Sequence, residues 1–343
     1  MYSESDIDGA VAAGVLSPAT AAAFRNYTAT SRYAPAVDEE HFKLLTGFND
    51  IFVAIALSLS LAAIAQIGSM VAPWLGGAGV AVAAWLLAEF FTRRRRMALP
   101  SILLLLAFVG GVAATMVGAV VSWNPDLPDR IDAVIGAGIG LATAGAAWLH
   151  WRRFMVPITV AAGAIALVGV AVALTLAAIP AAKDAIYPIA LAAGLGVFAL
   201  AMWWDMSDKE RRTRRADVAF WLHLAAAPLI AHPIFQMLGV FDQDVGIAKA
   251  AVVLGLYLVF AFVALTVDRR ALLVSSLVYV LYAMYALLQS AGAVELSAAL
   301  TAFVIGSALL TLSVFWHQMR GIAVGMLGSL KDRLPPVQTM VPA

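Results

Sequence analysis

Apolar segments long enough to cross a lipid bilayer recur along this chain and are separated by short polar turns. The hydrocarbon core of a bilayer, roughly 30 Å thick, needs about 20 apolar residues in a helix. Ten segments approach or exceed that length: 51–68, 71–91, 98–121, 132–150, 155–179, 186–204, 218–239, 248–267, 271–291 and 296–316. They are continuously apolar rather than alternating, which favours helices over barrel strands. The sequence therefore predicts an all-α, polytopic transmembrane bundle of about ten spans, built as consecutive hairpins.

The composition argues against a soluble domain and against several kinds of site. Hydrophobic residues make up 63% of the 343 residues and charged residues only 13%, whereas a soluble chain carries about 25% charged residues. The formal net charge is +1, so the basic excess expected of a nucleic-acid-binding protein is missing. The absence of cysteine excludes disulfides and thiolate metal sites.

Basic residues mark one side of the membrane. Four arginine clusters recur at spacings of 58, 59 and 58 residues, with members Arg94, Arg152, Arg211 and Arg269. Two apolar segments fit between successive clusters, so we expect all four on the same side, which then holds 19 of the 22 basic residues. Since lysine and arginine concentrate in cytoplasmic loops, both termini are predicted to be cytoplasmic. Generic hairpin geometry explains the even spacing better than internal duplication, which stays the alternative.

Three regions follow from this pattern. Residues 1–48 form a small cytoplasmic region, residues 49–316 the transmembrane bundle, and residues 317–343 a C-terminal interfacial helix and tail. In the first region, Ser17-Pro18 is typical of a helix start, which predicts helices at 4–13 and 18–29 and a third that begins near residue 38. The acidic N-terminus is unlike a signal or transit peptide, so the bacterial inner membrane is the simplest destination. The apolar face of the C-terminal helix comprises Met319, Ile322, Met326 and Leu330.

The turn from Gly14 to Pro18, with the sequence Gly-Val-Leu-Ser-Pro, lies between the two N-terminal helices and precedes many spans. In this it resembles an uncharacterised family of predicted bacterial membrane proteins. Members of that family carry a Gly-hydrophobic-hydrophobic-Ser helix pair before the membrane domain. The resemblance covers about 30 residues and the general architecture. It implies no activity, because the function of the family is itself unassigned.

Polar side chains inside the apolar segments are the candidates for function, because a bilayer makes their burial costly. The ninth segment carries the most polar face, which comprises Ser275, Tyr279, Tyr282 and Gln289. Hydrogen bonding between helices is the simpler explanation of this stripe. Lining a polar pathway or pocket is the alternative, and the stripe is our leading candidate site.

The seventh segment holds two histidines. His223 and His232 lie nine residues apart, on nearly opposite helical faces, so they cannot form one metal site from a single helix. Hydrogen bonding to a neighbouring helix is a simpler role for them than a proton relay. The sequence His232-Pro233, followed by Gln236, predicts a local break in the helix that would line a vestibule.

Charged residues in or near the segments have simpler explanations. Glu89 lies four residues before Arg93, which favours an ion pair near the lipid headgroups; a proton-accepting carboxylate that faces a cavity is the alternative. Asp205 and Asp268 lie beside arginines at segment ends, and we expect them to be interfacial charges.

No serine–histidine–acid order, HExxH motif or paired acidic motif occurs in a loop, and no residue is assigned a catalytic, cofactor-binding or metal-binding role. The leading hypothesis is a permease-like protein for a small, weakly charged or apolar solute, with the lipid bilayer and that solute as its partners and no nucleic acid. The alternative is a membrane scaffold or sensor in which residues 1–48 bind a protein partner. A membrane-embedded transferase ranks third, because the sequence shows no set of catalytic residues for it.

Overall fold

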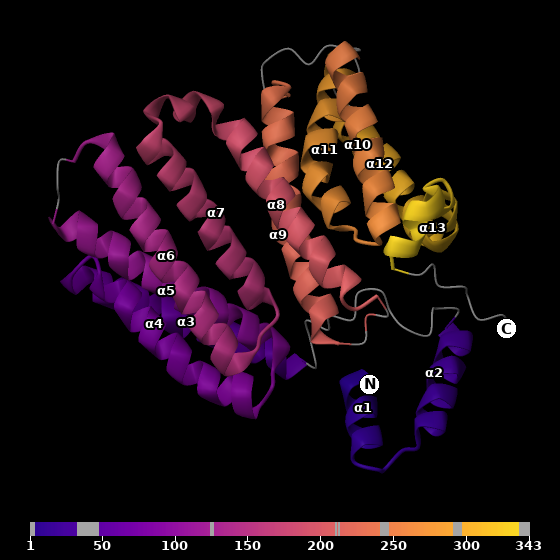
Figure 1. Cartoon of the computed structure of the whole chain (residues 1–343), viewed down its shortest axis with the longest axis horizontal. Helices are drawn as coiled ribbons and strands as arrows, with labels where there is room; N and C mark the ends of the chain where they lie inside the picture. Colours follow the sequence, from indigo (N-terminus) through magenta and orange to yellow (C-terminus); the bar gives the residue numbers. More distant parts are fainter. Residues whose placement is uncertain are drawn as a thin grey trace.

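The computed structural model describes residues 4–32, 48–123, 127–209, 211, 213–240, 247–290 and 297–335. These residues form helices and no β-strand (Figure 1). The α-helices are α1 (Glu4–Ala12), α2 (Pro18–Arg32), α3 (Phe48–Val71), α4 (Leu75–Ala88), α5 (Ala98–Trp123), α6 (Asp129–Phe154), α7 (Ile158–Ala178), α8 (Ile186–Met206), α9 (Arg214–Met237), α10 (Ile247–Val267), α11 (Ala271–Ser290), α12 (Ser297–Val314) and α13 (Trp316–Gly325). A π-helix, η1 (Glu89–Arg94), and two 3-10 helices, η2 (Pro180–Ala185) and η3 (Gly328–Arg333), complete the set.

Eight stretches of helix within the described residues are long and apolar enough to cross a membrane. They are Phe48–Val71, Leu75–Arg94, Ala98–Trp123, Asp129–Phe154, Ile158–Ala178, Pro180–Met206, Arg214–Met237 and Ala248–Val267. Each coincides with one of the first eight segments predicted from the sequence. The all-α prediction is confirmed for the described residues, and their apolar helices fit a membrane bundle.

The last two predicted segments differ from simple spans. Segment 271–291 coincides with α11, of which Ala271–Ala286 is a shorter apolar helix among the described residues. Segment 296–316 contains α12, which ends at Val314, and the chain then bends by 76° into α13. If the bent pair counts as one span, the described residues contain up to nine. The count of ten spans therefore stays a prediction.

The N-terminal helices lie where the sequence predicts them. Helices α1 and α2 are joined by a turn in which Gly14 has a φ of 72°, a conformation that glycine adopts without a steric penalty. The Ser17 hydroxyl caps α2 by accepting a hydrogen bond of 3.0 Å from the Thr20 amide. The pair lies below the bundle in Figure 1. The predicted start of a third helix near residue 38 lies outside the described residues.

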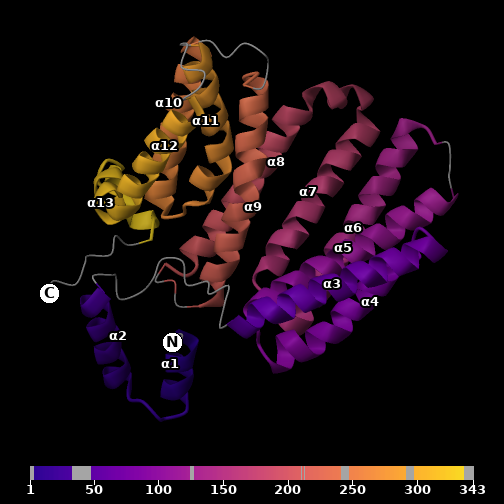
Figure 2. The same ribbon diagram turned by 180° about the vertical axis from the view of Figure 1, so that it is seen from behind.

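Helix α9 is the centre of the bundle. It packs against α7, α8 and α11, and 56% of its apolar window is buried, against 11–39% for the other seven spans. Figures 1 and 2 show it between the helices that begin at α3 and those that end at α13. One apolar core surrounds α9, and a second joins α3, α4 and α5 to the facing ends of α6 and α7; Trp221 packs against both. Side chains on α9 are therefore placed to contact helices of both apolar cores.

Two consecutive helices approach each other closely through a glycine. A Cβ atom on Gly194 of α8 would lie 2.7 Å from the backbone carbonyl carbon of Leu229 in α9. No ordinary side chain fits at that distance, so the absence of a Cβ lets the two backbones touch. This close contact fixes the position of α8, which carries Asp205 at its end.

Candidate functional site

A cluster of buried charges lies where α8 ends and α9 begins, and Asp205 is its first centre. Arg269, in the α10–α11 turn, donates from Nη2 to Asp205 Oδ1 at 2.6 Å and from Nε to Oδ2 at 3.2 Å. His223 on α9 places Nε2 2.9 Å from Oδ2 of the same carboxylate. Because a carboxylate only accepts hydrogen bonds, the His223 Nε2–H is the donor. All three side chains are buried.

Asp268 is the second centre of the cluster. Arg211 donates from Nη1 to Asp268 Oδ2 at 2.9 Å, and the Trp316 indole donates to Oδ1 at 2.9 Å. Arg320 on α13 adds an ion pair, with Nε 3.3 Å from Oδ1. These contacts tie Trp316 and Arg320 of α13 to Asp268 in the α10–α11 turn. We refer to Asp205, Arg211, His223, Asp268, Arg269, Trp316 and Arg320 as the buried ion network.

The backbone of the network is strained at two of its members. Arg211 and Asp268 have φ angles of 51° and 63°, in the left-handed region that L-residues rarely adopt. Arg211 also donates to the backbone carbonyls of Val267 and Asp268, at 3.1 and 3.3 Å, which holds the two strained turns together. Burial lowers the pKa of the Arg211 guanidinium, and the nearby Arg269 lowers it further, but arginine stays protonated in proteins.

Asp205 and Asp268 lie at the ends of their segments, as expected, but they are buried within the protein and not at its surface. Their residues are 0% and 4% exposed, and each is bonded to arginine. Sequence reasoning also missed Arg269 and Trp316 as their partners. The one available signal was an aspartate beside arginine at the ends of two spans. His223, by contrast, bonds a neighbouring helix, which is the simpler of the two roles considered for it.

A second polar cluster joins α9 to α11. His232 Nδ1 lies 2.6 Å from the hydroxyl oxygen of Tyr279. Phe235, one turn further along α9, stacks on the Tyr279 ring with centroids 4.4 Å apart. Tyr187 on α8 meets the His232 ring edge-on at a centroid distance of 6.1 Å. Tyr279 is buried whereas His232 is exposed, so the pair connects an interior hydroxyl to an imidazole at the protein surface.

The predicted helix break at His232-Pro233 is wrong. Helix α9 continues through Pro228 and Pro233 to Met237. Neighbouring helices can support proline within a buried helix, where packing outweighs the lost hydrogen bond. Gln236 consequently lies in the last turn of α9 and is half-buried.

The other members of the α11 stripe do not converge on one point. Tyr279 faces α9, Ser275 is half-buried, and Tyr282 is 36% exposed. Gln289 donates to the hydroxyl of Tyr285, one turn earlier in the same helix, at 2.9 Å. The structure therefore brings together Tyr279 and His232, two candidates from different segments, and places Gln289 in a local pair.

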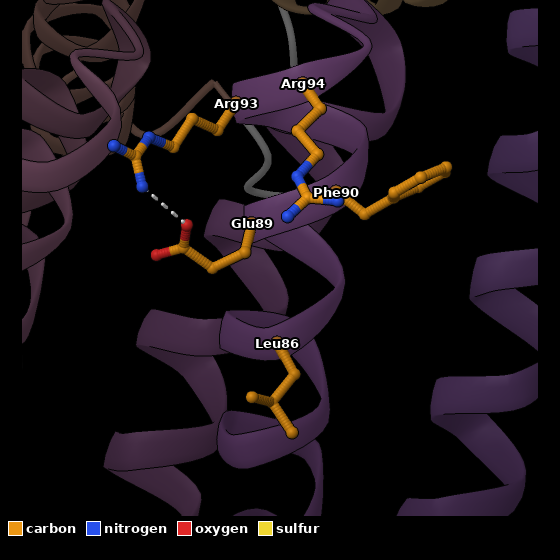
Figure 3. A pocket seen from close by; sticks show the side chains of 5 residues that line it. All are labelled: Leu86, Glu89, Phe90, Arg93 and Arg94. Carbon is orange, nitrogen blue, oxygen red and sulfur yellow. Dashed lines mark hydrogen bonds and ion pairs between the residues drawn. The ribbon is translucent and has the colours of Figure 1, made fainter.

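Glu89 lies in the π-helix η1, at the end of α4. The predicted ion pair with Arg93 is present at 3.2 Å. A closer partner comes from α6: Arg153 donates to the two oxygens of Glu89 at 2.6 and 2.9 Å. An open pocket of about 600 Å³ lies beside them, lined by Leu86, Glu89, Phe90, Arg93 and Arg94 (Figure 3). Glu89 is paired with two arginines and also lines this pocket, and the role of a proton acceptor stays the alternative.

The hydrogen-bond donors and acceptors of these clusters indicate which kinds of ligand they could bind. Within the described parts of the chain, no group of three or more His, Asp or Glu side chains is placed to hold a metal ion. The His232–Tyr279 pair can exchange hydrogen bonds with a small polar molecule, and the arginines near Glu89 can bind an anion. Comparisons with protein-family models, curated proteins and solved structures find no match for this chain.

Proposed function

We propose that this chain is a multi-pass protein of the bacterial inner membrane, with about ten spans and both termini in the cytoplasm. Eight apolar helices among the described residues support insertion, and α11 and α12 supply the two remaining spans. The concentration of 19 of 22 basic residues on one side supports the orientation. The turns that carry Arg94, Arg152, Arg211 and Arg269 then face the cytoplasm.

Within that membrane domain, the chain acts as a permease-like protein for a small, weakly charged or apolar solute. The observation that carries this proposal is the 2.6 Å contact between His232 on α9 and Tyr279 on α11. An exposed imidazole and a buried hydroxyl are bonded to each other, so a solute with a hydroxyl or amide group can replace one partner without leaving the other unsatisfied. Such an exchange avoids the penalty of an unpaired polar group in an apolar interior.

The buried charges argue against an ion-driven pump, and so they favour a permease whose solute carries little charge. Asp205 and Asp268 are the carboxylates of the buried ion network, and arginine pairs with each of them. In each pair the guanidinium supplies the counter-charge of the carboxylate, so both carboxylates are engaged in contacts between helices. Neither group is therefore suited to carry protons in a relay.

Flux into liposomes tests the proposal. The full chain is reconstituted, and glycerol and urea are offered as uncharged probes while vesicle volume is followed by light scattering. We expect uptake faster than in protein-free liposomes, and a loss of about tenfold in Tyr279→Phe, the factor that corresponds to one net hydrogen bond. Tyr285→Phe, on the same helix but in the local pair with Gln289, is the matched control. Equal uptake with and without protein contradicts the proposal.

The alternative is a scaffold or sensor whose N-terminal region binds a protein partner. It is favoured by the α1–α2 pair, in which Ile7 and Ala21 are buried while Val15 and Tyr27 are 76% and 72% exposed. Deletion of residues 1–36 separates the two functions. A permease keeps its glycerol flux after this deletion, whereas a scaffold or sensor loses its function.

A further inference from the structure

We propose that one face of α4 and η1 binds an anionic phospholipid, a role separate from the solute pathway. The site consists of Val82, Leu86, Phe90, Arg93 and Arg94. The phosphate of the lipid lies at the two arginines, and an acyl chain follows the three apolar side chains. The open pocket of about 600 Å³ occupies the polar end of this face (Figure 3).

The apolar part of the site is a continuous exposed stripe. Val82, Leu86 and Phe90 are separated by four residues each, so they lie on one side of the helix, and they are 61%, 65% and 42% exposed. The stripe runs about 12 Å along the axis at 1.5 Å per residue. Because it belongs to the candidate span Leu75–Arg94, it faces hydrocarbon in a membrane. It leads directly from the apolar part of the span to the pocket.

The polar part of the site has a surplus of positive charge. Glu89 supplies one carboxylate, and Arg153 binds it through two hydrogen bonds of 2.6 and 2.9 Å. Arg93 and Arg94 also line the pocket. Three guanidiniums against one carboxylate leave a net charge of +2 at the site. The planar, forked guanidinium matches the oxygens of a phosphate and is the preferred donor for that group.

The backbone sets this site apart from an ordinary basic turn. Glu89, Phe90, Arg93 and Arg94 all belong to the π-helix η1, and π-helical turns are rare and recur at functional sites. Glu89 accepts hydrogen bonds from Arg153 and forms an ion pair with Arg93 at 3.2 Å. Figure 3 draws the Glu89–Arg93 contact as a dashed line. The arginines are thereby presented at the end of the span, at the level of the lipid headgroups.

The combination of the two parts identifies a lipid rather than a soluble anion. Free phosphate uses the arginines but gains nothing from Leu86 and Phe90. A zwitterionic lipid gains from the apolar stripe, but its cationic headgroup opposes the surplus positive charge. An anionic phospholipid is the ligand class that satisfies both, and basic pockets at the ends of membrane helices are known to bind such headgroups.

Lipid titration of the full chain in an uncharged detergent tests the site, with bound lipid counted by native mass spectrometry. The probes are phosphatidylglycerol, phosphatidylcholine and inorganic phosphate. We expect phosphatidylglycerol to bind more tightly than the other two. Arg94→Gln weakens its binding about fivefold and Arg93→Gln/Arg94→Gln about 25-fold, since each arginine near a membrane surface contributes about a factor of five. Leu86→Ser weakens phosphatidylglycerol binding without changing phosphate binding.

Arg152→Gln is the matched control. Arg152 is an exposed arginine on α6, next to Arg153, and its guanidinium lies over the Trp148 ring instead of in the pocket. This variant should bind phosphatidylglycerol as the wild type does. Equal binding of phosphatidylglycerol and phosphatidylcholine overturns the proposal, as does an equal loss in Arg152→Gln and Arg94→Gln. Phosphate binding as tight as lipid binding assigns the site to a soluble anion instead. Unfolding midpoints confirm that each variant is folded.

Discussion

Arg269 and Asp205 form a bidentate ion pair that joins the α10–α11 turn to the end of α8, with N–O distances of 2.6 and 3.2 Å. Both side chains are less than 5% exposed. The pair lies 64 residues apart in the sequence, and His223 adds a third helix segment to it through Asp205. It therefore connects the α8–α9 hairpin to the C-terminal helices at a place where water does not compete.

Removing one partner of this pair should destabilise the protein strongly. Asp205→Asn leaves the Arg269 guanidinium buried without its counter-charge, and we expect a loss of about 3–5 kcal/mol in the free energy of unfolding. The exposed pair of Glu89 provides the comparison: Glu89→Gln should cost about 1 kcal/mol or less. Unfolding in detergent, followed by tryptophan fluorescence, measures both. If the two variants lose similar amounts of unfolding free energy, the buried ion pair of Asp205 contributes no more to stability than the exposed one of Glu89.

Helix α13 should become more dynamic when the contact of Arg320 with Asp268 is removed. Trp316 and Arg320 hold α13 to Asp268 through contacts of 2.9 and 3.3 Å. In Arg320→Met, one of these contacts is lost and the Asp268 carboxylate loses a counter-charge. Amide hydrogen exchange across 316–325 should become faster, while exchange in α6 and α7 stays as in the wild type. Unchanged exchange in α13 would mean that other contacts keep it in place.

Two glycines of α8 should respond to the same substitution with opposite signs. A Cβ on Gly194 would lie 2.7 Å from the Leu229 backbone, whereas one on Gly196 meets nothing within 4 Å. Gly194→Ala should therefore separate α8 from α9 at a cost of about 1–3 kcal/mol. Gly196→Ala should stabilise the helix by about 0.5–1 kcal/mol, because alanine favours the helical backbone. The difference between their unfolding midpoints measures the α8–α9 contact directly.

Cysteine labelling should settle the orientation of the bundle, and the natural sequence has no cysteine to interfere. Ala181, in η2, and Ser207, after α8, are exposed at opposite ends of the candidate span Pro180–Met206. With both termini cytoplasmic, an impermeant thiol reagent should label Ala181→Cys in intact cells and Ser207→Cys only after permeabilisation. The reverse pattern would place both termini outside.

Local sequence patterns were sufficient for most of the helical framework. The length of one apolar run is enough to predict each long span, because a membrane helix satisfies its backbone hydrogen bonds within itself. The Ser17 cap and the ion pair of Glu89 with Arg93 were also predictable, since their partners lie three and four residues apart. The break expected at Pro233 was not found, because packing around α9 supports a proline that an isolated helix tolerates poorly.

The sequence by itself determined that this chain forms apolar helices of membrane-spanning length, since that property depends on neighbouring residues alone. Only the tertiary structure decided which polar groups meet. Asp205 with Arg269, and His232 with Tyr279, are separated by 64 and 47 residues, and no periodicity within one helix encodes such pairs. Burial of these polar side chains requires a partner, but the relative placement of the helices selects which one it is.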